Sequence, residues 1–224
     1  DLMLVKGKFY LACVCDIDDP KLIDTIEALG VDLGIANIAT DSDGRRYTGE
    51  TVEKVRANLH RRRAGLQARG TKAAKRRLRK LSKKQARFQK HENHCISKAL
   101  VDAAQRTGRA IGLEDLTHIR RRVTARRGQR ARLSNWAFAQ LRQFVAYKAR
   151  RAGIPVLLVD PRHTSQGCSC CGSIDKANRK SQDTFSCTGC GHRDHADINA
   201  ARNIRSRAEA ALRNPALSSA RLAA

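Results

Sequence analysis

Apolar and polar positions alternate at a strand-like period near the start of the chain. Phe9 to Cys15 is an apolar run rich in β-forming residues, and Gly30 to Thr40 predicts a second strand. The next four residues, Asp41 to Gly44, favour a hairpin turn, because glycine adopts a positive φ readily. Arg45 to Tyr47 should therefore return antiparallel to the second strand.

Leucines at helical spacing follow these strands. The segment from Lys54 to Lys90 contains helix formers throughout but only sparse apolar positions, so it predicts two basic helices broken near Gly70-Thr71. A better apolar stripe from His91 to Gly108 predicts a neighbouring third helix. Arg109 to Leu116 then predicts a short buried strand that ends in two acids.

The last third of the chain repeats this alternation of helix and strand. Asn135 to Ala152 predicts a helix with Ser134 as its N-cap, and Ile154 to Asp160 predicts a strand apolar enough to be covered on both faces. Asp197 opens an alanine-rich helix to about Arg213, and the tail beyond Pro215 should be loose. Strands alternating with helices predict an α/β core with a mixed sheet.

Charge changes the picture of the helices. The formal net charge of the 224 residues is +24, which indicates a polyanionic partner and favours nucleic acid over an anionic membrane. Lys54 to Lys90 holds sixteen Lys or Arg and no acid, so like charges would repel within an isolated helix. No apolar run approaches the roughly 18 residues that span a bilayer, and we expect no membrane partner.

Four of the eight cysteines have the spacing of a metal site. Cys168, Cys171, Cys187 and Cys190 form C-x2-C-x15-C-x2-C, which predicts one structural Zn²⁺ without an open coordination position. Cys170, His192 and His195 are weaker alternative ligands. The other three cysteines, at positions 13, 15 and 95, are expected to be small core residues, and this usage suits a reducing compartment.

Three carboxylates lie in apolar settings that make burial unfavourable without compensation. Asp32 follows a valine in VDLG, Glu114 ends IGLE, and Asp197 begins the last helix. If the strands are neighbours the acids converge, and Mg²⁺ would hold them ionised against their mutual repulsion. Two such ions can activate water and stabilise the leaving oxygen of a phosphodiester. Spacing alone leaves three alternatives open: a turn acid, a salt-bridge partner and an N-cap.

The segments GVDLGIANIATDSDG, IGLEDL, TSQGCSCCG with FSCTGCG, and ADINAARNI together resemble the OrfB/TnpB family of insertion-sequence proteins. The resemblance covers nearly the whole chain in the family's order. It implies an RNase H-like (RuvC) nuclease, related to type V CRISPR effectors, with Asp32, Glu114 and Asp197 as the acids and a zinc ribbon at the four cysteines. Asp197 is preferred to Asp194 because it stands two residues before Asn199.

The same resemblance implies a division of the chain. Residues 1–20 would be a remnant of an N-terminal β-rich domain or first strand, and relatives carry a further N-terminal region. Residues 21–163 would form the nuclease core with a basic helical insertion at about 50–108, followed by the zinc ribbon at 164–193. Residues 194–213 would complete the nuclease and 214–224 a flexible tail. His163 stands where relatives have Asn.

Basic side chains in two stretches are predicted to contact nucleic acid phosphates. They are Arg61, Arg62, Arg63, Lys72, Lys75, Arg76, Arg77, Arg79, Lys80, Lys83, Lys84, Arg121, Arg122, Arg126 and Arg127. A solvated charged face is the alternative.

These observations lead to one hypothesis and two competitors. The first is a Mg²⁺-dependent DNA endonuclease with structural zinc, a DNA target and a guide RNA, in a bacterial-type cytoplasm near the nucleoid. The second is a catalytically silent or truncated relative that binds nucleic acid as a regulator. The third is a structural RNA-binding protein, which would gain nothing from buried acids on strands.

Overall fold

A mixed sheet forms the centre of the computed structural model, which describes residues 1–5, 7–16, 18, 20–34, 36–117, 138–214 and 221–222. Within these residues the strand order is β10-β7-β6-β3-β4-β5. Neighbours β3, β6 and β7 are parallel, and the other pairs are antiparallel. The strands are β3 (Ala28–Asp32), β4 (Asn37–Asp41), β5 (Arg46–Thr48), β6 (Ala110–Glu114), β7 (Val156–Val159) and β10 (Arg221–Leu222). The predicted mixed α/β sheet is confirmed.

Two strand predictions need correction. The single strand expected from Gly30 to Thr40 is two antiparallel strands, β3 and β4. Gly34 lies in the tight connection between them, where an added Cβ would come within 2.8 Å of the Asn37 carbonyl oxygen. The tail is also not loose throughout, because β10 bonds to the backbone of β7 and covers an edge that would otherwise be open.

Alternation along the strands gives the sheet two different faces. Leu29 and Val31 of β3 point into the larger core, together with Ile111 and Leu113 of β6. The intervening positions are small or acidic, and they face the other way. This second face is where the last helix packs, so the smaller cluster there is rich in alanine.

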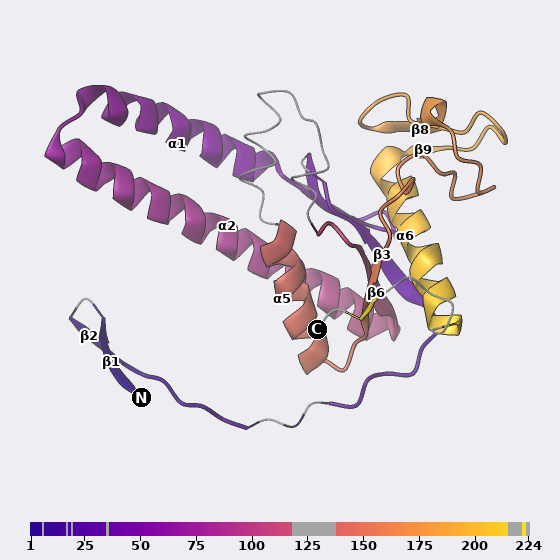
Figure 1. Cartoon of the computed structure of the whole chain (residues 1–224), viewed down its shortest axis with the longest axis horizontal. Helices are drawn as coiled ribbons and strands as arrows, with labels where there is room; N and C mark the ends of the chain where they lie inside the picture. The colour runs from indigo at the N-terminus through magenta and orange to yellow at the C-terminus, as the bar shows by residue number, and fades with distance from the viewer. Residues whose placement is uncertain are drawn as a thin grey trace.

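Helices α1 (Glu50–Arg69) and α2 (Lys72–Thr107) form a long antiparallel pair that extends away from the sheet (Figure 1). Gly70 ends α1 with φ +63°, and the Thr71 side chain caps α2 by accepting from the Ala74 N–H at 3.1 Å. The predicted break is confirmed. The separate third helix was wrong, because nothing between Lys72 and Thr107 interrupts α2.

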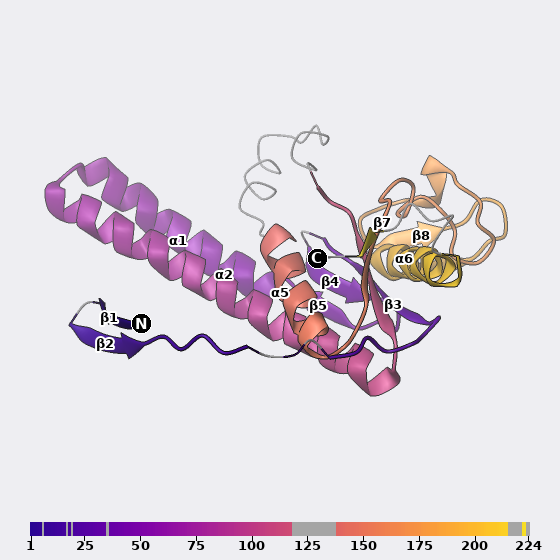
Figure 2. The same cartoon turned by 60° about the horizontal axis from the view of Figure 1, so that its bottom comes forward.

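Only the second half of α2 belongs to the core. Ile96, Leu100 and Ala104 pack on the sheet with Leu141 and Val145 of α5 (Phe138–Arg151). Turning the molecule shows α2 and α5 on one face of the sheet and α6 (Ala196–Arg213) on the other (Figure 2). In α1, by contrast, Leu59 is the one buried residue.

A small module lies beyond the N-terminal end of α6 (Figure 1). It contains the antiparallel strands β8 (Thr184–Ser186) and β9 (Arg193–His195) and a short 3-10 helix, η1 (Lys176–Asn178). Its core is small: Phe185 is fully buried beside Cys168, Cys187 and Ala196. So little apolar area indicates that the module needs another source of stability.

The N-terminal segment corrects the expected core cysteines. Strands β1 (Leu2–Val5) and β2 (Lys8–Leu11) pair only with each other in the described residues, and their side chains are exposed. Cys13 and Cys15 follow them and are exposed too, since this segment does not join the main sheet. Cys95 is exposed on the outer side of α2, where its sulfur lies 3.7 Å from His91 Nε2.

Some predictions lie outside the described residues: the phosphate contacts from Arg121 to Arg127 and the Ser134 cap. Helix α5 agrees with the remainder of the predicted helix. None of the helices in the described part of the chain has the length and apolarity to cross a membrane.

Candidate functional site

The three acids predicted from the sequence lie on the α6 side of the sheet. Asp32 ends β3 and Glu114 ends β6, and the parallel register aligns Val31 with Leu113 just before them. Both strands are parallel, so their carboxyl ends meet at one edge of the sheet. Asp197 is in the first turn of α6, which crosses the same edge. The fold therefore brings the three carboxylates together.

Two glycines allow α6 to approach this closely. Gly30 lies two residues before Asp32, and an added Cβ there would sit 2.1 Å from the Ala201 carbonyl oxygen and 2.4 Å from the Arg205 nitrogen. Gly112 lies two residues before Glu114, where a Cβ would be 2.8 Å from the Ala208 Cβ. Neither position has room for a side chain. On each strand, the glycine lets α6 pack closely and the acid two residues later lies beside the start of that helix.

The charges of the acids interact unfavourably. Burial raises the pKa of Asp32 well above its ordinary value, and the nearby carboxylates of Glu114 and Asp197 raise it further. The opposing effects of Arg179 and of the Leu33 backbone N–H are smaller. A metal-free Asp32 therefore tends to hold a proton that a bound cation would displace.

Glu114 is buried, and burial is also the main reason that its pKa is raised. The Thr164 hydroxyl, in the loop after β7, donates to Glu114 Oε1 and opposes this shift. Arg207 and Arg179 oppose it by their charge. Glu114 consequently has one oxygen held by a neutral donor.

Asp197 is held from both sides. It is 4% exposed, and its Oδ2 accepts from Asn37 Nδ2 at 2.8 Å. Arg179 Nη2 lies 3.4 Å from its Oδ1. The N-cap of α6 is His195, whose Nδ1 accepts from the Asp197 N–H at 3.2 Å, so Asp197 is not the cap. Asp194 instead pairs with Arg202 at 2.6 Å.

The donor set fits a hard divalent cation. Carboxylate oxygens are the preferred ligands of Mg²⁺ and Mn²⁺. Thr40 lies opposite Asp32 in the β3–β4 register, and its buried hydroxyl has no partner among the described residues. An orphaned hydroxyl opposite a carboxyl whose pKa is raised by burial and by neighbouring acids indicates a site that is incomplete without an ion and its water.

The four predicted zinc ligands converge in the small module. Their sulfur atoms all lie within 4.8 Å of one another, with Cys168 3.7 Å from Cys190 and Cys171 3.6 Å from Cys187. A tetrahedron with Zn–S bonds of about 2.3 Å has sulfur–sulfur edges of about 3.8 Å. The cluster therefore has the dimensions of a structural Zn²⁺ site.

Proton sharing within this cluster is uneven. The Cys190 and Gly189 backbone N–H groups lower the pKa of Cys187 to about 6. Cys190 itself accepts from the His192 N–H, which lowers its pKa, but the neighbouring thiols and burial raise it to about 12. One ready thiolate surrounded by backbone donors is an arrangement that a cation would complete.

The alternative zinc ligands do not join the described cluster. Cys170 is exposed outside it. His195 caps α6, and its Nε2 lies 3.7 Å from Asp183. His192 Nε2 lies 3.9 Å from Asp194 Oδ2.

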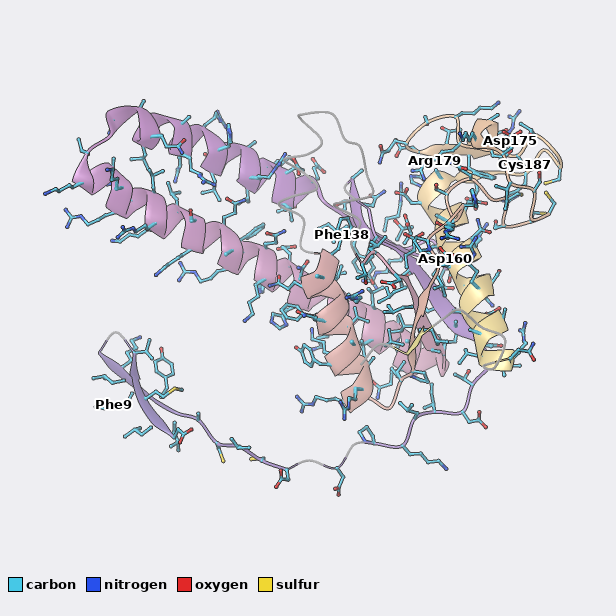
Figure 3. The ribbon with its side chains drawn as sticks, viewed as in Figure 1. Phe9, Phe138, Asp160, Asp175, Arg179 and Cys187 are labelled. Atoms are coloured by element: carbon cyan, nitrogen blue, oxygen red, sulfur yellow. The ribbon has the colours of Figure 1, made fainter. Side chains whose placement is uncertain are left out.

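Three residues of the site went unrecognised in the sequence: Asn37, Thr164 and Arg179. Arg179 lies in the small module, as Cys187 does (Figure 3), and it reaches Asp197 across the boundary with α6. Each is a common polar residue, and nothing local sets it apart. Only the fold shows that all three contact the predicted acids.

Most of the predicted phosphate contacts lie on the exposed hairpin of helices. Arg61, Arg62 and Arg63 are on α1, and the lysines and arginines from Lys72 to Lys84 are on α2. A groove of about 440 Å³ lies between the two helices, lined by Arg62, Gly65, Leu66, Arg69, Arg77, Lys80 and Leu81. The four other predicted contacts, from Arg121 to Arg127, lie outside the described residues.

Comparison with protein families agrees with this arrangement. Residues 12–118 match the OrfB_IS605 family, described as a probable transposase, and residues 138–204 match the Cas12f1-like TNB domain. The predicted resemblance to the OrfB/TnpB family is confirmed. The first match contains the strands that end in Asp32 and Glu114, and the second contains the four cysteines and Asp197.

Individual relatives support the assignment. The CRISPR-associated endodeoxyribonuclease Cas12f1 of Sulfoacidibacillus thermotolerans is 37% identical over 89% of this chain and 50% of the relative. "Putative RNA-guided DNA endonuclease InsQ" of Escherichia coli is 28% identical over 88% of this chain and 53% of InsQ. The chain thus spans about half the length of these relatives.

A solved structure supports the fold. A Cas12f1–sgRNA–target DNA complex superposes with a TM-score of 0.64 at 22% identity, over 85% of this chain and 51% of that chain. At this sequence identity the superposition shows that the two chains share a fold. The likeness supports the α/β fold with a mixed sheet that was predicted for this chain.

Proposed function

We propose that this chain carries the active site of a Mg²⁺-dependent, RNA-guided endodeoxyribonuclease that hydrolyses phosphodiester bonds. The observation that supports this most strongly is the group of three buried or half-buried acids on three separate elements. A structural binding protein gains nothing from carboxylates that repel one another in this way. The relatives named as endodeoxyribonucleases support the same reading.

Each acid has its own role in this proposal. Asp32, Glu114 and Asp197 would hold two Mg²⁺ ions, which when bound supply Lewis acidity for water attack and leaving-group departure. Asn37 and Thr164 hold Asp197 and Glu114 in place by hydrogen bonds. Arg179 presents a guanidinium beside Asp197, where it can bind a phosphate oxygen of the substrate.

Partners follow from the charge of the helical hairpin. The basic residues of α1 and α2 would bind the phosphates of a guide RNA and its DNA target, at a distance from the acids. The four cysteines would hold Zn²⁺ as a structural ion. We place the protein in the cytoplasm, in association with the nucleoid.

The test is cleavage by the full chain, purified with its bound RNA and given matching DNA. We expect cutting in Mg²⁺, and a loss of at least about 10³-fold in Asp32→Asn and Glu114→Gln, because each removes an ion ligand. Glu50→Gln is the matched control, since Glu50 is an exposed acid on α1. DNA binding without cutting by the unchanged protein would support a regulator instead.

A further inference from the structure

One loop connects the two predicted metal sites. It runs from Pro161, just after β7, to Gly167, which precedes the first zinc ligand, Cys168. Thr164 lies in the middle of this loop and is 4% exposed. Its hydroxyl donates to Glu114 Oε1 and also lies 3.0 Å from the Pro161 carbonyl oxygen.

A threonine hydroxyl has a single hydrogen, so it cannot donate to both oxygens at once. When Glu114 is ionised, the hydrogen goes to its carboxylate, which fixes one oxygen and leaves the other to face an ion. Thr164 therefore holds Glu114 in one orientation, and the nearby Pro161 carbonyl oxygen keeps the hydroxyl in place.

The loop is itself fixed by the side-chain amides of two residues of α6. Asn203 Nδ2 donates to the carbonyl oxygens of Thr164 at 2.9 Å and Gly167 at 2.7 Å. Asn199 is fully buried, and it donates to Gly167 at 2.8 Å and accepts from the Ser169 N–H at 3.0 Å. Helix α6, the first cysteine knuckle and Thr164 thus form one hydrogen-bonded unit.

We propose that Thr164 is a positioning residue that fixes Glu114 for metal binding and transmits the folded state of the zinc module to the acids. This inference rests on the proposed function of the acid site. It predicts that the module contributes to catalysis through Glu114 as well as through Arg179. Backbone geometry agrees: His163 has φ +61°, a left-handed conformation that marks a tight turn directly before Thr164.

The experiment measures Mn²⁺ binding to the zinc-loaded full chain by calorimetry without nucleic acid. Thr164→Val removes the hydroxyl at nearly constant volume and should weaken Mn²⁺ binding by about 10-fold, the lower end for loss of an outer-shell partner. Thr164→Ser should bind as tightly as the unchanged chain, and both should keep one zinc. Thr188→Val is the matched control, because its hydroxyl lies 3.1 Å from Asn178 Oδ1 within the zinc module.

Thr164→Ala is a second variant in case the valine prevents folding, and it should show the same weakening. Equal Mn²⁺ affinity in Thr164→Val and the unchanged chain would overturn the proposal, while Glu114→Gln still weakened binding. Loss of zinc from Thr164→Val would also overturn the proposal, because the hydroxyl would then stabilise the zinc module and have no separate role at Glu114. Absence of Mn²⁺ binding by the unchanged chain would remove the acid site and with it the proposed function.

Discussion

The four thiols and the three carboxylates are both clusters of anion-forming side chains, but the fold assembles them differently. The thiols come from one short segment and lie in a module with its own small core. The carboxylates come from two strands and a helix far apart in the chain. Strand pairing brings Asp32 to Glu114, and the packing of α6 on the sheet adds Asp197. The thiol cluster is local, whereas the carboxylate cluster is a product of the whole fold.

The dependence between the two clusters runs one way. All four thiols of the zinc module lie in one segment, so we expect the module to fold around its ion without the acids. The acids, however, depend on the module, because Arg179 and the loop of Thr164 both reach them from it. Damage to the thiols should therefore reach the acids, and damage to the acids should leave the thiols intact.

The largest effect is expected for Cys187→Ser. Structural zinc contributes on the order of 10 kcal/mol to a small module, so we expect loss of zinc and protease cleavage between residues 164 and 193. Cleavage activity should fall as well, since Arg179 and Thr164 lose their positions. Zinc analysis and limited proteolysis measure the outcome, with Cys170→Ser as the exposed control. Retained zinc would remove Cys187 from the ligand set.

Gly30→Ala tests the assembly of the carboxylates. The new Cβ would meet backbone atoms of α6 at 2.1 and 2.4 Å, so the helix must shift. We expect a loss of about 4 kcal/mol in the free energy of unfolding and of divalent-cation binding, with zinc retained. Gly65→Ala in α1 has no atom within 4 Å of the new Cβ, and it should stabilise by about 0.5–1 kcal/mol. Chemical denaturation compares them, and equal stability would contradict the close approach.

Arg179→Ala tests a contact between the zinc module and the acids without changing the thiols. We expect cleavage to fall about 30-fold, or about 2 kcal/mol, because the guanidinium beside Asp197 is removed while the zinc ligands are unchanged. Arg193→Ala removes an exposed arginine of the same module and serves as control. A similar fall in both variants would indicate general phosphate attraction.

Asp32→Asn should change the pH dependence of stability in zinc-loaded protein without Mg²⁺. Because the folded pKa of Asp32 is raised, the folded state binds more protons than the unfolded state above pH of about 4. The free energy of unfolding then falls as pH rises, by at most about 1.4 kcal/mol per pH unit for one proton. The variant lacks this loss, so its stability relative to the unchanged chain should grow as pH rises above about 4. Thermal unfolding measures both proteins across this pH range. Parallel curves of stability against pH would contradict the repulsion between Asp32 and its neighbouring acids.

The smallest effect is expected on the basic hairpin. Replacing Arg76 and Arg79 with Gln removes two exposed charges of α2. The slope of log affinity against log salt should fall by about 1 for each phosphate that the protein no longer neutralises, with zinc and cation binding unchanged. Filter binding across a salt series measures this, and an unaltered slope would leave these residues as a solvated face.

The sequence predicted the local features well. Cysteine spacing identified the four thiols that converge, and the Gly70-Thr71 break located the turn between α1 and α2. Residues far apart were harder. Arg179, Asn37 and Thr164 carry no local signal, because their partners lie on other elements. The apolar run around Cys13 led to the wrong prediction of a core cysteine. The β1–β2 hairpin pairs outside the main sheet, and composition does not indicate which strands pair.

The central claim is that Asp32, Glu114 and Asp197 bind divalent cations together. Anomalous diffraction from crystals of the full chain grown with Mn²⁺ tests it most directly. We predict manganese peaks contacting all three carboxylates, separate from a zinc peak at the four cysteines. A zinc peak without manganese at the acids, at Mn²⁺ concentrations that support cleavage, would contradict the account.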